Sequence, residues 1–215
     1  MKQLLYKEFR LVTHPVLPFF LLLSAMLLIP AYPFYVVFFY TTLGLFFCCL
    51  TGRENHDILY TISLPIRKRS AVSARFLFAI IVEMMQMLLV VLFMRLRHAL
   101  QIGVNPAGMD ANLSFLGLSF LLLGVFNFSF FRRYYAAPDQ VGKAFALSSV
   151  FVFLLITLLE AGTHILPFMR DMLDTPDPQF LGVKIPFLLC GVLVYALLTF
   201  LSWRISAKRF ERLDL

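Results

Sequence analysis

The sequence predicts an all-α polytopic membrane protein with six transmembrane helices. The first reason is composition: 60% of the 215 residues are hydrophobic and 14% are charged, whereas soluble domains are about 45–50% apolar and about 25% charged. The second reason is that the apolar residues gather into six long runs. These runs do not alternate between polar and apolar positions, as the strands of a membrane β-barrel would. Helices are therefore the predicted spanning elements.

A hydrocarbon core needs about 17–25 helical residues, and each run is long enough or nearly so. We expect residues 1–215 to form a single transmembrane domain. A loop at about 162–184, rich in Pro and Asp, is expected to be structured at the outer surface. The spans are placed at about residues 13–31, 34–51, 76–94, 113–131, 145–163 and 185–203.

Residues 1–12 predict a helix that lies along the membrane surface. In "MKQLLYKEFRLV", the side chains of Leu4, Leu5 and Phe9 fall on one helical face, away from Lys2 and Lys7. An amphipathic helix of this kind buries its apolar side at the lipid boundary. The alternative is an ordinary positively charged flank of the first span.

The distribution of Lys and Arg predicts the orientation, because cytoplasmic loops carry an excess of these residues. Fifteen of the 19 lie before the first span, between the second and third, after the fourth, or at the C-terminus. We therefore expect both termini in the cytoplasm, and the formal net charge of +7 gives no reason to expect nucleic acid as a partner. The four cations on the outer side are Arg95, Arg97, Arg170 and Lys184.

Residues 52–69 form one polar segment between the second and third spans. Ile58, Leu59 and Ile62 have the spacing of one apolar face of a short helix. Pro65 disfavours helical geometry at the residue before it, so this helix is expected to end there. The segment then forms a rigid projection, which is suited to insertion into a cleft of a soluble partner.

Two polar features are expected to fix this short helix. Asn55 or Thr51 can cap its N-terminus by accepting from an unpaired backbone N–H. Beyond Pro65, long cationic side chains can keep their charges in water while their stems cover apolar surface. The predicted membrane-interface anchor comprises Arg67, Lys68, Arg69 and Arg75.

The run "GRENHDILYTISLPIRKRSAVSARFLF" resembles the connection between the second and third spans of ABC-2 type exporter permeases. In small members, an acidic residue and a leucine-containing helix precede "SLP", a basic cluster and a further Arg or Lys. Here these features fall on Glu54, Leu59, residues 63–65, residues 67–69 and Arg75. The layout of six spans behind an interfacial helix is also similar. The short chain most resembles six-helix bacterial exporters of peptides, lantibiotics or phenol-soluble modulins, which implies a multi-pass protein of the bacterial cell membrane.

The resemblance implies a division of labour between two kinds of subunit. The permease forms the membrane path as a homo- or heterodimer, and a separate cytoplasmic ATPase binds ATP and Mg²⁺, so no cofactor is expected in this chain. The chain also lacks a phosphate-binding loop, because Ala137 stands where G-x-x-x-x-G-K-[ST] requires a glycine. The family's ATPase-coupling role is transferred to Arg53, Glu54, Asn55, His56, Asp57, Ile58, Leu59 and Ile62.

Two other functional classes compete with a transport subunit. An intramembrane enzyme is disfavoured, because the sequence has neither H-E-x-x-H nor G-x-S-x-G. Its four histidines also lie at the ends of different runs, so we expect no catalytic or metal-binding residues. A non-transporting immunity or regulatory membrane protein is the main alternative, and a neighbouring ATPase gene would argue against it.

A polar face within the third predicted span suggests a translocation path. An ionised Asp at a helix centre costs roughly 2.5–3.5 kcal/mol on insertion scales, and Glu should be comparable. This cost indicates that Glu83 has a structural or functional role. Residues on this face either line the substrate path or pack helices together. The candidate path residues are Glu83, Gln86, Met87, Val90 and Met94.

Overall fold

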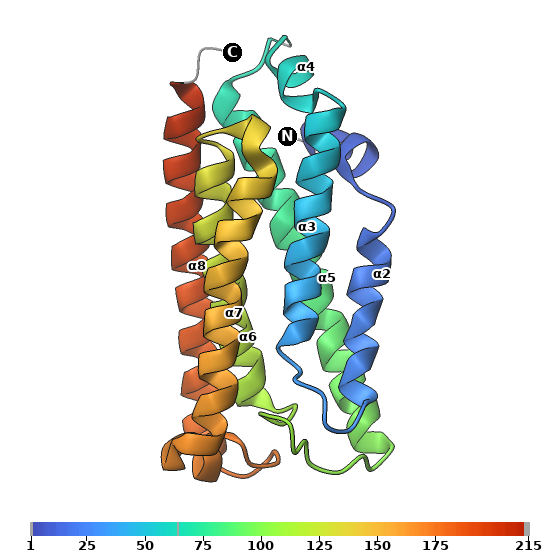
Figure 1. The fold of residues 1–215 in the computed structure, drawn as a ribbon, viewed down its shortest axis with the longest axis vertical. Helices are drawn as coiled ribbons and strands as arrows, with labels where there is room; N and C mark the ends of the chain where they lie inside the picture. Colours follow the sequence, from blue (N-terminus) through green and yellow to red (C-terminus); the bar gives the residue numbers. More distant parts are fainter. Residues whose placement is uncertain (1, 64, 213–215) are drawn as a thin grey trace.

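The computed structural model describes residues 2–63 and 65–212. These residues form a bundle of long helices, with no strand among them, which confirms the predicted all-α class. Figure 1 shows that the helices run roughly parallel to one long axis. Both described ends of the chain lie toward the end of the bundle that also holds the short helix α4 (Asp57–Ser63).

The N-terminal part of the chain is sharply bent. The helices α1 (Lys2–Lys7) and η1 (Glu8–Val12) turn by 89° into α2 (Leu17–Leu22) and the 3₁₀ helix η2 (Leu23–Leu28). Residues 2–12 therefore cross the bundle axis, consistent with the predicted interfacial helix. The helical part of the first predicted span, 13–31, is shorter than its apolar run.

Five long helices account for the other predicted spans, and each is long and apolar enough to cross a membrane. Several extend beyond the predicted ranges, because a helix can continue past the hydrocarbon layer that its apolar run matches. The third predicted span, for instance, lies within a helix of 32 residues. The remaining elements are α3 (Val36–Glu54), α5 (Lys68–Ala99), α6 (Leu113–Tyr134), η3 (Pro138–Gln140), α7 (Val141–Ile165), η4 (Met169–Leu173) and α8 (Leu181–Glu211).

Small residues allow α6 and α8 to pack backbone against backbone. A Cβ added to Gly191 would lie 2.1 Å from the carbonyl oxygen of Gly117, and one added to Gly124 would lie 3.0 Å from the Cα of Tyr195. Side chains at these glycines would force the helices apart. Close approach through small residues is a common way for helices to associate in membranes.

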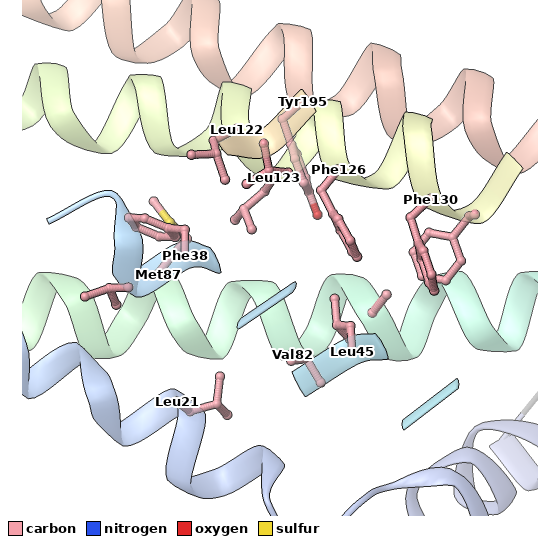
Figure 2. Packing of buried hydrophobic residues seen from close by; sticks show 14 of the residues in the cluster. Leu21, Phe38, Leu45, Val82, Met87, Leu122, Leu123, Phe126, Phe130 and Tyr195 are labelled. Atoms are coloured by element: carbon pink, nitrogen blue, oxygen red, sulfur yellow. The ribbon is translucent and has the colours of Figure 1, made fainter. Parts of the chain in front are cut away.

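The core lies where α2, α3, α5, α6, α7 and α8 meet. Figure 2 shows apolar side chains of α2, α3, α5 and α6 pointing toward one another, including Leu21, Phe38, Val82 and Phe126. Tyr195 of α8 points into the same interior. The middle of the bundle is therefore filled by side chains from all the long helices, α7 included, and Glu83 is embedded in it.

Candidate coupling site and intramembrane polar site

The helix α4 follows α3 after a two-residue reversal. Asn55 and His56 form this reversal, and His56 has a positive φ of 49°. The α4 helix begins at Asp57, so His56 and not Asn55 occupies its N-cap position, and Asn55 Nδ2 donates to the carbonyl oxygen of Leu11 at 3.1 Å. Thr51 lies inside α3, so the predicted capping by either residue is wrong. Asn55 instead ties the corner to the N-terminal segment.

The short helix is also displaced along the chain from its predicted position. Arg53 and Glu54 are the last residues of α3, and α4 begins at Asp57. The helix ends at Ser63, before Pro65, in agreement with the predicted stop; Leu64 and the side chain of Ile62 lie outside the described residues. Arg53 donates to the carbonyl oxygen of Asp139 at 3.2 Å and so joins this corner to η3.

One side of the α4 corner is exposed, and it includes two large apolar side chains. Leu59 is 53% exposed and its neighbour Tyr60 is 55% exposed. Glu54 and His56 are exposed beside them, whereas Ile58 is partly buried against the core. We call Glu54, His56, Leu59 and Tyr60 the docking surface. Tyr60 was not predicted, because it lies outside the Ile58–Leu59–Ile62 spacing.

Asp57 points away from the docking surface into a buried ion-pair network. Its Oδ2 lies 2.6 Å from Arg75 Nη2, and its Oδ1 lies 2.6 Å from Lys7 Nζ. Glu8 completes the network by pairing with Arg75 Nε and, at 3.3 Å, with Lys7 Nζ. We call these four residues the charge clasp. It joins η1 and the end of α1 to α4 and to the start of α5.

The charge clasp corrects two predictions about individual residues. Arg75 is 3% exposed, so it is a buried ion-pair partner and does not belong to the interface anchor. Asp57 is 4% exposed, so its carboxylate is not available for docking. The burial of both side chains was not expected, because their partners Lys7 and Glu8 lie about 50 residues or more away in sequence. A coupling role of Asp57 through these ion pairs stays a prediction.

Further hydrogen bonds surround the charge clasp. Lys7 Nζ donates to Thr61 Oγ1 at 2.6 Å, and Arg75 Nη1 donates to the hydroxyl of Tyr134 at 3.3 Å. The clasp thus contains two cations and two anions with satisfied hydrogen bonds, the condition under which buried charges are tolerated. Burial raises the pKa of the adjacent Tyr135 well above its ordinary value, so its phenol stays neutral.

The other predicted anchor residues stay near the surface of the same corner. Arg67 and Arg69 are exposed and Lys68 is partly buried. The guanidinium of Arg69 lies 4.7 Å from the centre of the Trp203 ring of α8, a cation–π contact that links the start of α5 to α8. Their position at the level of lipid headgroups remains a prediction.

Glu83 lies in a second polar site, fully buried between α5, α6 and α8. Its Oε2 accepts from the hydroxyl of Tyr195 at 2.6 Å and from Asn127 Nδ2 at 3.0 Å. Asn127 Nδ2 also donates to Thr199 Oγ1 at 3.1 Å. Within the described part of the chain, Glu83 Oε1 and Asn127 Oδ1 are buried without a hydrogen-bond partner. The partners of Glu83 were not predicted from the sequence, although an Asn within an apolar run indicates a buried polar contact.

The rest of the candidate path also lies mostly inside the bundle. Gln86, Met87 and Val90 are buried, and Gln86 Nε2 donates to Ser24 Oγ of η2 at 2.8 Å. Met94 is partly buried at the far end of the face. This placement favours the helix-packing alternative for the face of α5 that includes Glu83, as far as a single subunit is concerned.

Glu83→Leu is expected to lower the thermal stability of the purified protein in detergent. The change removes the acceptor of the Tyr195 hydroxyl and one of the two acceptors of the Asn127 amide, and a buried donor left without a partner costs about 1–3 kcal/mol. Glu83→Gln keeps a carbonyl acceptor for both donors and buries no charge, so its melting temperature should match or exceed that of the wild type. Met84→Leu, at an exposed neighbouring position, is the control. A transport defect in Glu83→Gln at unchanged stability would instead support the path hypothesis.

No group of three or more His, Cys, Asp or Glu side chains able to hold a metal ion occurs among the described residues. The arrangement of polar groups is therefore one of ion pairs and hydrogen bonds that join helices, together with an exposed corner at α4. Such a site can bind a partner and transmit displacement between helices.

A family model described as ABC-2 family transporter protein matches residues 3–211. The chain belongs to the ABC-2 transporter family. As an ABC-2 permease, it is a multi-pass membrane subunit of an ABC transporter, and members of this family are generally transport subunits without a catalytic site of their own. The match extends from the N-terminal segment of the charge clasp to the end of α8. No curated protein and no solved structure matches the chain.

Proposed function

We propose that this ABC-2 permease is the membrane subunit of an exporter in the bacterial cell membrane, and that a separate cytoplasmic ATPase docks on α4. The observation that supports this most strongly is the exposed Leu59–Tyr60 pair on a short helix whose opposite side is fixed by buried ion pairs. Neighbouring exposed apolar and aromatic side chains are typical anchors of protein interfaces. The ABC-2 family implies an ATPase partner in general.

The proposed orientation of the bundle in the membrane rests on the distribution of Lys and Arg between its two ends. Fifteen of the 19 Lys and Arg residues belong to the segments at the α4 end, so we assign this end to the cytoplasm. The described residues nearest the two termini, 2 and 212, lie at the same end of the bundle (Figure 1). The ATPase, ATP and Mg²⁺ are then on the side where α4 projects.

The charge clasp explains how docking on α4 can move the membrane helices. A push on Leu59 or Tyr60 reaches Asp57 within the same short helix, and Asp57 is bound to Arg75 of α5 and to Lys7 of the N-terminal segment. Displacement of α4 is therefore shared between a spanning helix and the surface helix. A flexible loop would dissipate the same motion.

We further propose that the path forms between two permease subunits, identical or different. The interior of one bundle is filled by side chains (Figure 2), so a path within it would require the helices to separate. Exposed apolar side chains on α7 and α8 offer surfaces for a second subunit or for lipid. The resemblance to small bacterial peptide exporters makes an amphipathic peptide the proposed substrate.

This function predicts an ABC ATPase gene beside the permease gene, and co-expression of the two tests it. Affinity-purified permease should retain the ATPase, and an amphipathic helical peptide should stimulate ATP hydrolysis by the reconstituted complex. A peptide of the same composition in scrambled, non-amphipathic order is the matched control. Failure of the permease to retain the ATPase in membranes and in detergent would favour the non-transporting immunity or regulatory alternative.

A further inference from the structure

A cavity of about 320 Å³ lies at the end of the bundle opposite α4. Its wall consists of the last two turns of α5, part of the loop that follows, the start of α6, and residues 176–177. These segments lie at the lower end of the bundle in Figure 1. The volume is at the lower end of the roughly 300–1,000 Å³ typical of small-molecule sites.

Along α5, the cavity wall is first apolar and then basic toward the end of the bundle. Val91 and Met94 of α5 line it together with Leu113 and Leu116 of α6. Arg95 and His98 line it further along α5, toward the end of the bundle. At 1.5 Å per residue, the α5 wall from residue 91 to residue 98 covers about 10 Å along the helix. The wall therefore matches an amphiphile whose polar end points away from the membrane centre.

The acidic groups of the cavity are already paired within the protein. Asp177 accepts from Lys184 Nζ at 3.0 Å and from the backbone N–H of Leu113 at 3.1 Å. Asp110 lies 3.6 Å from Arg97 Nε and accepts from the backbone N–H of Ala111. These carboxylates therefore do not neutralise a further cation in the cavity.

Arg95 differs from the other cations at this end of the bundle. Arg97 is buried and donates to the carbonyl oxygens of Leu27 and Gly103, and Arg170 pairs with Asp171 at 2.8 Å. Among the described residues, Arg95 has no ion pair, and it is exposed beside His98. The cavity thus offers one unpaired guanidinium and an adjacent imidazole to a ligand.

The apolar side of the cavity is continuous with an exposed stripe of α5. Val91 lines the cavity and is 38% exposed, while Leu88 and Leu92 beside it are 71% and 59% exposed. A ligand held at Arg95 can therefore extend an acyl chain along α5 into the bilayer. A helical peptide is too large for the cavity itself, whereas a lipid headgroup is of suitable size.

We propose that this cavity binds the headgroup of an anionic phospholipid, with its phosphate on Arg95 and His98 and its acyl chains along Val91, Leu88 and Leu92. Arg pairs well with phosphate because its planar N–H groups form two parallel charge-assisted hydrogen bonds, and an imidazole N–H supplies a further donor. With the α4 end in the cytoplasm, as given under Proposed function, this cavity lies in the outer leaflet; the lipid-binding proposal itself does not rest on that orientation.

Native mass spectrometry of the purified permease tests the proposal, with phosphatidylglycerol and phosphatidylcholine of identical acyl chains added to the detergent. The wild type should retain phosphatidylglycerol in preference to phosphatidylcholine. The double variant Arg95→Gln/His98→Gln should bind phosphatidylglycerol about tenfold more weakly, the loss expected for charge-assisted hydrogen bonds. Phosphatidylcholine binding and the melting temperature in lipid-free detergent should not change.

Arg170→Gln is the matched control, since it removes an exposed cation from the same end of the bundle but outside the cavity. The proposal is overturned if the wild type retains both lipids equally, if the double variant binds phosphatidylglycerol normally, or if Arg170→Gln weakens binding as much. Displacement by an amphipathic peptide, without a preference for the anionic lipid, would also overturn it. The assay contains no ATPase, so its result is independent of the proposed docking on α4.

Discussion

Arg75→Met is expected to destabilise the permease strongly and to abolish stable association with the ATPase. The substitution leaves Glu8 and Asp57, which are 1% and 4% exposed, with Lys7 as their only cation within the charge clasp. Breaking a buried ion pair by removing one partner costs about 3–5 kcal/mol, because a buried charge stays uncompensated. Thermal unfolding in detergent and retention of the ATPase during purification measure the two effects.

Two further variants separate the charge clasp from a general effect of lost charge. Arg67→Met removes an exposed cation from the same basic segment and should change stability little. Adding Glu8→Gln to Arg75→Met removes one of the two stranded anions, so it should restore part of the lost stability, as expected for coupled partners. Equal melting temperatures of Arg75→Met and Arg67→Met would contradict the structural role of the clasp.

Leu59→Asp combined with Tyr60→Ser is expected to weaken ATPase binding while the permease remains folded. Both side chains are more than half exposed, so the change disturbs little within the subunit. The few hot-spot residues at the centre of an interface contribute about 2 kcal/mol or more, and Tyr is enriched among them; this corresponds to about 30-fold in affinity. Binding of purified ATPase to permease in nanodiscs measures the loss, and Glu54→Ala should have a smaller effect at the edge of the docking surface.

The control for the docking variant is Lys208→Ala, an exposed position at the same end of the bundle on α8. Asp57→Ala should behave differently from both, because it breaks the charge clasp and should lower the melting temperature. Normal ATPase affinity in the Leu59→Asp/Tyr60→Ser variant would exclude the docking surface as the main contact.

Among the described residues, five of the six predicted spans correspond to helices long and apolar enough to cross a membrane, because hydropathy and length are local properties of the chain. The first predicted span, 13–31, contains only the short helical stretch 17–28, which follows the 89° bend. The ends of the helices were less predictable: α5 begins at Lys68, eight residues before its predicted apolar span, since the polar start of the helix lies outside the apolar run. The N-terminal bend agrees with the predicted surface helix. Pro65 likewise indicated the end of α4, because a proline acts on its immediate neighbour.

The polar sites could not be predicted in the same way. In the sequence, Arg75 resembles the other cations of its basic cluster. In the fold, it pairs with Glu8, which is 67 residues away in sequence. Glu83 similarly depends on Tyr195, 112 residues away. Helical spacing shows which residues share a face, but it does not show which other helix covers that face.

The central claim, that a separate ATPase docks on α4, is tested most directly by site-specific photo-crosslinking in cells that express both subunits. With p-benzoylphenylalanine in place of Tyr60, ultraviolet light should join the permease to the ATPase, and the product should decrease when Leu59→Asp is added. The same probe at Phe168, exposed at the opposite end of the bundle, should give no such product. Crosslinking to the ATPase from Phe168 and not from Tyr60, or from neither position in a complex that hydrolyses ATP, would contradict the account.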